Sequence, residues 1–179
     1  MAKVVKTSAC GSLFLTFLFI VFYQRWNMDI FLTLAITFGT IAYHFCMRLL
    51  VGLLVELRMH NRTDYRKQWY QLRPFEEKLY VKLGVKKWKD RMPTYEPGLF
   101  SLKEHSLEEI VGAMCQAEIV HEIIVLCSFL PILASIPFGE LGVFIITSVL
   151  AAGFDAMFVM MQRYNRARIV KVIECKKVL

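Results

Sequence analysis

The chain has 179 residues, 56% of them hydrophobic, and carries a formal net charge of +7. A soluble domain of this length rarely combines so much apolar sequence with 22 lysine and arginine residues, which argues against an ordinary soluble globular fold. The apolar residues concentrate in four runs long enough to cross a hydrocarbon core. They predict an all-α fold, an integral membrane four-helix bundle forming a single domain over residues 1–179. The runs cover residues 9–23, 30–55, 110–136 and 141–161.

The basic residues predict the orientation of these helices. Two lysines precede the first run and one arginine follows it, whereas twelve basic residues lie between Arg58 and Lys103 and six between Arg163 and Lys177. Basic residues accumulate on the cytoplasmic side, so both termini and the polar segment 56–109 are predicted to be cytoplasmic. Anionic lipid accounts for the positive charge, and we therefore expect no nucleic-acid partner. The five cysteines form no CxxC pair, and neither a metal site nor a cofactor is predicted.

The second run differs from the first because it carries ionisable residues. His44 and Arg48 are four residues apart and therefore share a helical face. Arg48 lies close enough to the cytoplasmic end for its side chain to reach the membrane surface, whereas His44 needs a partner inside the protein. We expect both residues to contribute to a substrate pocket.

The polar segment is expected to contain a helix lying on the membrane surface. Pro74 is placed as a first-turn residue and Gly84 as the end of that helix. Phe75, Leu79 and Leu83 recur at a spacing of four, with charged residues around them, which is the pattern of an interfacial amphipathic helix.

A basic stretch, KKWKDRMP at residues 86–93, follows this helix and is expected to form a loop because prolines lie within and after it. Trp88 and Lys89 in this loop either anchor the chain to lipid, which their residue types favour, or bind a phosphate or sugar headgroup.

The third run contains the densest group of ionisable residues. Ser106 and Glu109 fit a capping box and so mark the start of a helix. Further along, Glu118, His121 and Glu122 share one face of that helix at about 100° per residue. Ionisable groups at membrane depth are costly and usually mark a functional site, so this cluster is the leading candidate.

The fourth run carries Asp155 in an apolar surround and ends in a basic stretch that includes Arg163 and Arg166. A buried carboxylate needs a cation, and Arg48 or His44 are the expected partners of Asp155. Because the turn between the third and fourth runs is short, we expect their helices to be antiparallel neighbours whose polar faces converge on one cavity.

This chain lacks the residues of several well-known catalytic and metal-binding motifs. Di-iron carboxylate bundles need more than one Glu-x-x-His pair, and the sequence has only four histidines and no GxSxG, HExxH, HxxxxD or phosphate-binding loop. An imidazole beside carboxylates remains, and it suits proton abstraction from a hydroxyl group. The alternative is a non-catalytic lipid-binding or assembly subunit, in which the polar cluster only fixes the packing of the helices.

Three stretches, KKWKDRMP (86–93), CQAEIVHE (115–122) and MQRYNRAR (161–168), resemble in this order the glycosyl-diaponeurosporenoate acyltransferases. These small bacterial membrane enzymes of staphyloxanthin biosynthesis esterify a sugar hydroxyl of a glycosylated carotenoid with a fatty acyl chain. The resemblance covers roughly residues 79–168, and departs from the expected pattern at Glu122 and Ala167, where an aromatic residue and a proline are expected. It singles out Trp88, Lys89, Glu118, His121, Arg163, Asn165 and Arg166.

The resemblance implies transfer of an acyl chain from a cytoplasmic thioester donor to a hydroxyl of a membrane lipid or glycolipid in the bacterial cytoplasmic membrane. We expect His121 to be the general base and Glu118 to orient it, with Cys115 as a less favoured nucleophile. Glu122 and His44 would line the acceptor pocket. Arg163 and Arg166 would bind the donor or stabilise an oxyanion. The expected substrate-binding residues are Glu122, His44, Arg48, Asp155, Trp88, Lys89, Arg163, Asn165 and Arg166.

Overall fold

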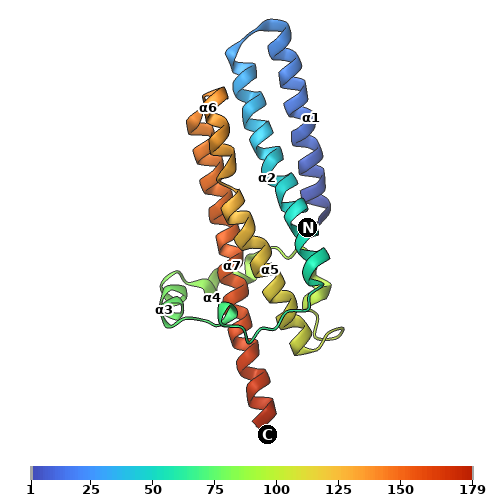
Figure 1. Ribbon diagram of the computed structural model, residues 1–179, viewed down its shortest axis with the longest axis vertical. Coiled ribbons are helices and arrows are strands. Elements are labelled where there is room, and N and C mark those ends of the chain that lie inside the picture. Colours follow the sequence, from blue (N-terminus) through green and yellow to red (C-terminus); the bar gives the residue numbers. More distant parts are fainter. Residues whose placement is uncertain (1, 179) are drawn as a thin grey trace. The chain divides into compact units, whose positions relative to one another are not determined.

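The computed structural model describes residues 2–178, which form helices, turns and loops but no strand (Figure 1). The α-helices are α1 (Ala2–Trp26), α2 (Asp29–Met59), α3 (Pro74–Lys82), α4 (Val85–Trp88), α5 (Leu107–Cys127), α6 (Ser135–Phe138) and α7 (Leu141–Val178). Short 3-10 helices are η1 (Gln68–Tyr70), η2 (Lys89–Arg91), η3 (Pro97–Phe100) and η4 (Leu130–Ala134). Within residues 2–178, four stretches are long and apolar enough to cross a membrane: Ala2–Trp26, Asp29–Met59, Leu107–Phe138 and Leu141–Lys177. The predicted all-α membrane class is thereby confirmed.

The chain divides into two compact units. The first contains residues 2–52 and Ile123–Phe154, and the second contains Leu53–Glu122 and residues 155–178. The long helices α2, α5 and α7 each contribute to both units.

In the first unit, α1 and α2 form a helical hairpin. The turn between them uses Asn27 in a left-handed conformation with φ 49°, and Phe22 packs edge-on against Phe31 across it, with ring centroids 5.5 Å apart. The Tyr43 hydroxyl of α2 donates a hydrogen bond of 2.9 Å to the carbonyl of Cys127, the last residue of α5. This bond satisfies a carbonyl that the end of the helix leaves without an intrahelical partner.

In the second unit, α5 and α7 share a core with the polar segment. Tyr70, Val111, Cys115 and Ile173 are buried together, and Tyr65, Leu107, Ile119, Ile169 and Val170 pack around them. This packing explains why α7 continues to Val178, well past the apolar run that ends at residue 161. Residues in the polar part of α7 still face a protein interior.

The end of α2 approaches α5 very closely in this unit. Asn61 donates its backbone N–H to Gln116 Oε1 at 2.6 Å, and the Gln116 amide in turn contacts Glu56. At Gly112 an added Cβ would lie 2.6 Å from the Asn61 carbonyl oxygen, so only glycine fits. His60 and Asn61 both have positive φ, of 49° and 57°, which these contacts stabilise.

The polar segment follows most of the sequence expectation. Pro74 opens α3, and Gly84 follows it with φ 63°. The capping box is present, because Glu109 N–H donates to Ser106 Oγ at 3.3 Å and Ser106 N–H donates to Glu109 Oε2 at 2.7 Å. The expected loop over 86–93 is wrong for residues 86–91, since residues 85–88 form α4 and residues 89–91 form η2.

Candidate functional site

The second unit buries a group of polar side chains between α5, α7 and the segment from η1 to α3. The helix α5 contributes Glu118, and α7 contributes Asp155, Arg163 and Arg166. The exposed fraction is 0% for Glu118 and Asp155 and 2% for Arg166. Charges buried to this degree are stable only when they are paired and hydrogen-bonded.

Glu118 is the centre of a three-residue ion cluster with two arginines of α7. Arg163 Nη1 donates to Glu118 Oε1 at 2.6 Å, and Arg166 Nη1 donates to Glu118 Oε2. Charge-assisted hydrogen bonds of this kind are the strong ones in proteins. Both carboxylate oxygens of Glu118 are therefore occupied by guanidinium groups.

Arg163 also fixes the polar segment to α7. Its Nη2 donates to Glu76 Oε2 at 3.0 Å, and its Nε lies 2.8 Å from Glu76 Oε1 in the same ion pair. The same guanidinium donates to the carbonyls of Trp69 and Gln71, each at 3.2 Å. One arginine thus holds η1 and α3 against the two long helices.

Arg166 makes a parallel set of contacts one turn further along. Its Nη2 donates to the Tyr70 carbonyl at 2.7 Å, and its guanidinium lies 5.1 Å from the centre of the Tyr70 ring. Such stacking adds a cation–π attraction to the hydrogen bond.

The charges around Glu76 shift two pKa values. Burial disfavours the ionised Glu76 carboxylate, but the Arg73 N–H and the Arg163 guanidinium outweigh it and lower the pKa of Glu76. Tyr80 donates to Glu76 Oε1 at 3.3 Å, and burial together with that carboxylate raises the pKa of Tyr80 to about 12.

His121 lies on α5 beside this cluster and pairs with a different carboxylate. Its Nδ1 is 2.8 Å from Asp155 Oδ1, and its ring stacks on Phe158 with centroids 4.5 Å apart and planes at 5°. The His121 side chain is 21% exposed, whereas that of Asp155 is 1% exposed. The sequence suggested that Glu118 orients His121. In the structure, the carboxylate that contacts the His121 ring is instead that of Asp155. A carboxylate on Nδ1 fixes the tautomer that leaves Nε2 as the proton acceptor.

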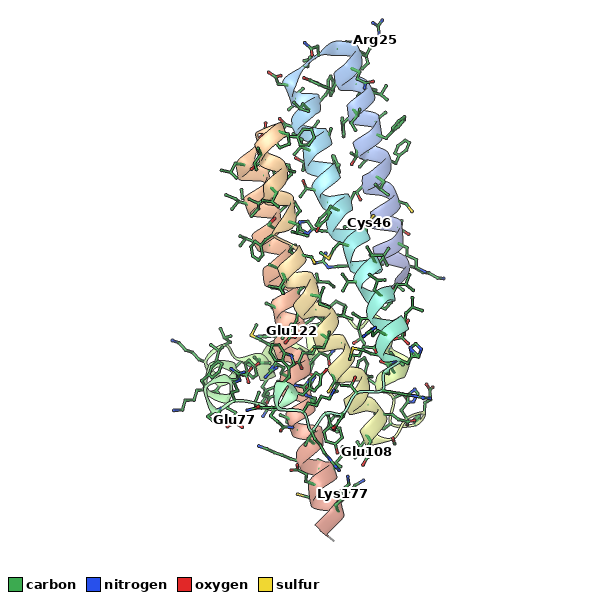
Figure 2. All side chains as sticks on the ribbon, viewed as in Figure 1. Arg25, Cys46, Glu77, Glu108, Glu122 and Lys177 are labelled. Carbon is green, nitrogen blue, oxygen red and sulfur yellow. The ribbon has the colours of Figure 1, made fainter. Side chains whose placement is uncertain are left out.

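Glu122 follows His121 by one residue and is partly buried (Figure 2). Its Oε2 accepts a hydrogen bond of 3.1 Å from the Trp69 indole Nε1. Glu122 and His121 therefore both lie where α5 meets the polar segment and α7.

Trp88, Lys89 and Asn165 lie outside this ion cluster. Trp88 Nε1 donates to the Leu83 carbonyl at 3.1 Å, and Lys89 Nζ lies 2.6 Å from Asp90 Oδ1, so both bonds are local. Asn165 is partly buried on α7 between the two arginines. Their expected role in substrate binding stays a prediction.

His44 and Arg48 belong to the first unit. His44 is 5% exposed and its ring packs edge-on against Tyr43, with centroids 5.4 Å apart. The Arg48 guanidinium lies 6.0 Å from the centre of the Phe154 ring. Their expected place in a substrate pocket, and their expected pairing with Asp155, stay predictions.

The first unit also contains an apolar cavity of about 460 Å³. From α2 it is lined by Leu32, Ile36 and Gly39, and beyond α5 by Leu130 and Phe138. Thr40 and Tyr43 of α2 also line it.

Sequence reasoning did not identify Trp69, Tyr70, Glu76, Tyr80 or Phe158 as parts of the site. Glu76 is 87 residues from Arg163, and no periodicity connects them. The only signal was indirect, namely that two buried arginines need more than one carboxylate. Among residues 2–178, no three His, Cys, Asp or Glu side chains are grouped so that they could hold a metal ion.

A family model described as glycosyl-4,4'-diaponeurosporenoate acyltransferase matches residues 66–175 of this chain. The match includes η1, α3, α5 and most of α7, and with them every residue of the ion cluster and the His121–Asp155 pair. No curated protein and no solved structure matches the chain.

Proposed function

Because this chain belongs to the glycosyl-4,4'-diaponeurosporenoate acyltransferase family, we propose that it transfers a fatty acyl chain from a thioester donor to a sugar hydroxyl of a membrane-embedded glycolipid. The family description implies a glycosylated carotenoid as the acceptor. In this proposal the protein lies in the bacterial cytoplasmic membrane with both termini in the cytoplasm, where a water-soluble thioester donor is within reach.

The observation that carries the proposal is the pairing of His121 with Asp155. The carboxylate holds Nδ1–H and stabilises the ring when it becomes charged, while stacking on Phe158 fixes the ring plane. Nε2 is then the base available to a hydroxyl group. The partial exposure of His121 is compatible with access by a substrate.

The proposed reaction has two steps. The acceptor oxygen attacks the thioester carbonyl carbon as His121 Nε2 takes the hydroxyl proton, which gives a tetrahedral intermediate. The C–S bond then breaks and the imidazolium returns its proton to the departing sulfur. The products are an ester and a free thiol.

We assign the remaining residues by their surroundings. Glu122, held by Trp69, lies beside His121 and suits hydrogen bonds to sugar hydroxyls. Arg163 and Arg166 have donors engaged by Glu118, Glu76 and backbone carbonyls, so we assign them a positioning role. The apolar cavity of the first unit suits a hydrocarbon chain, and the substrate-binding roles of His44, Arg48, Trp88, Lys89 and Asn165 belong to the same proposal.

The alternative function is a non-catalytic lipid-binding or assembly subunit. Its support is the Glu118 cluster, whose charges are satisfied within the protein in the manner of a structural element. The His121–Asp155 pair supports the catalytic function over this alternative, because its imidazole is partly exposed as well as oriented.

The test is lipid mass spectrometry on cells that make the glycosylated carotenoid acceptor and express either the wild-type chain or His121→Ala. We expect an acylated product with the wild type and with the control His105→Ala, which changes a histidine of the polar segment. The product should be absent with His121→Ala at equal membrane abundance. Product formation by folded His121→Ala would contradict the catalytic role. A wild type that leaves a confirmed acceptor unmodified would contradict the proposed substrate.

A further inference from the structure

The helix α3 directs two side chains with polar groups toward the protein and leaves apolar side chains exposed, both on the helix and at its C-cap residue Leu83. Glu76 and Tyr80 are buried, whereas Phe75, Leu79 and Leu83 are 59%, 41% and 47% exposed. A helix packed on a soluble domain shows the opposite arrangement. We call Phe75, Leu79 and Leu83 the apolar stripe of α3.

Lysines flank the apolar stripe. Lys78 and Lys82 lie on α3 beside it, and Lys86 and Lys87 follow on α4; all four are exposed. A narrow apolar stripe edged by lysines is typical of helices that lie in the headgroup region of a bilayer. The lysines add attraction to anionic lipid.

Salt bridges join α3 to a helix that is itself a candidate membrane span. Arg163, which holds Glu76, lies within the stretch Leu141–Lys177 that is long and apolar enough to cross a bilayer. Lys171 Nζ of α7 lies 4.0 Å from Glu77 Oε1 of α3. The bilayer that α7 would cross is therefore an apolar surface close to the apolar stripe.

We propose that the apolar stripe of α3 is seated at the boundary between headgroups and acyl chains of an anionic bilayer, and that this seating positions His121. The connection runs through contacts between buried groups. Glu76 binds Arg163, Arg163 binds Glu118, and Glu118 precedes His121 by less than one helical turn on α5. The lipid surface thus acts on the orientation of the catalytic imidazole. The seating itself does not depend on the reaction, whereas the effect on His121 rests on the proposed function.

The seating is tested by fluorescence on the full chain in nanodiscs. Leu79→Cys and Val81→Cys are each made with exposed Cys10 and Cys175 replaced by serine, and labelled with an environment-sensitive dye. Val81 is the matched control because it is an apolar α3 residue, 81% exposed, on a different face. In nanodiscs of phosphatidylglycerol and phosphatidylcholine, nitroxide-labelled lipid should quench the fluorescence of the dye at position 79. The fluorescence of the dye at position 81 should stay unquenched. Equal quenching at both positions would overturn the seating.

The coupling is tested by replacing the stripe. Phe75→Ser with Leu79→Ser leaves Glu76 and Arg163 in place, and we expect acyl transfer in nanodiscs to fall about 10- to 100-fold, as for other small misplacements of catalytic groups. Val81→Ser should keep the wild-type rate. Full activity in the double variant would overturn the coupling. If the wild type itself transfers no acyl chain, the proposed function fails, while the quenching result still decides the seating.

Discussion

Arg163 Nη1 lies 2.6 Å from Glu118 Oε1, in an ion pair between side chains that are 8% and 0% exposed. A second arginine, Arg166, occupies the other oxygen of the same carboxylate. The pair joins α5 to α7, and through Glu76 the same guanidinium also holds α3. A pair of this kind is costly to break from one side, because the remaining charge stays buried without its counter-ion.

Removing this carboxylate should therefore destabilise the second unit. Glu118→Ala leaves two buried guanidinium groups facing each other, and we expect a loss of about 3–5 kcal/mol in the free energy of unfolding. Thermal unfolding of the variant in detergent micelles measures this loss of stability. The control is Glu108→Ala on the same helix, since Glu108 is 52% exposed and 3.9 Å from Lys177, a pair worth less than about 1 kcal/mol. Equal melting temperatures for both variants would show that the ion cluster does not hold the unit together.

The His121–Asp155 pair predicts a different outcome for Asp155→Asn. The amide has nearly the shape of the carboxylate but no charge to stabilise an imidazolium, and it permits the wrong tautomer. We expect kcat for acyl transfer to fall about 10²- to 10⁴-fold with little change in KM. The same assay on Asp155→Glu, which restores the charge, should recover part of the loss. If Asp155→Asn lowers kcat no more than Asp90→Asn does, Asp155 has no role in proton transfer.

The helices and the polar cluster followed from sequence, but the pairing of the charges did not. Apolar runs, the capping box at Ser106 and the start of α3 at Pro74 depend on residues close together in the chain, so local rules identify them. Helical periodicity also placed Glu118, His121 and Glu122 on one face. Periodicity within one helix does not indicate which carboxylate of another element contacts each of these residues.

Asp155 illustrates the limit. It is 34 residues from His121, and its proximity to the ring depends on how α7 packs on α5. Sequence spacing favoured Glu118, which is nearer along the chain, but in the structure two arginines occupy both oxygens of that carboxylate. Trp69 and Glu76 escaped prediction for the same reason, since neither the short η1 nor the periodicity of α3 indicates which residues of α5 and α7 they contact.

The shifted pKa values predict how stability depends on pH. The pKa of Glu76 is lower in the folded chain than its ordinary value of 4.5, so its stabilising effect is complete above that value and is lost as pH falls through the folded pKa. The pKa of Tyr80 is raised from 10.0 to about 12, so its contribution is complete below pH 10 and is lost as pH rises between these values.

Melting temperatures measured across both pH ranges should therefore decline at each end. Glu76→Gln should flatten the acid decline and lower the plateau, because Arg163 loses a charged partner. Tyr80→Phe should flatten the alkaline decline only. Unchanged acid and alkaline slopes in the two variants would assign the pH dependence to other groups.

The contact of Gly112 with Asn61 gives a prediction that concerns only packing. In Gly112→Ala the new Cβ would lie 2.6 Å from the Asn61 carbonyl oxygen, and that backbone is held by Gln116 in a left-handed conformation. We expect a destabilisation of about 1–3 kcal/mol, measured by thermal unfolding in micelles. Gly153→Ala is the matched control on α7, because no atom lies within 4 Å of its added Cβ. There alanine should be neutral or stabilising by up to about 1 kcal/mol, through its higher helix propensity. A stabilising Gly112→Ala would mean that the end of α2 moves freely away from α5.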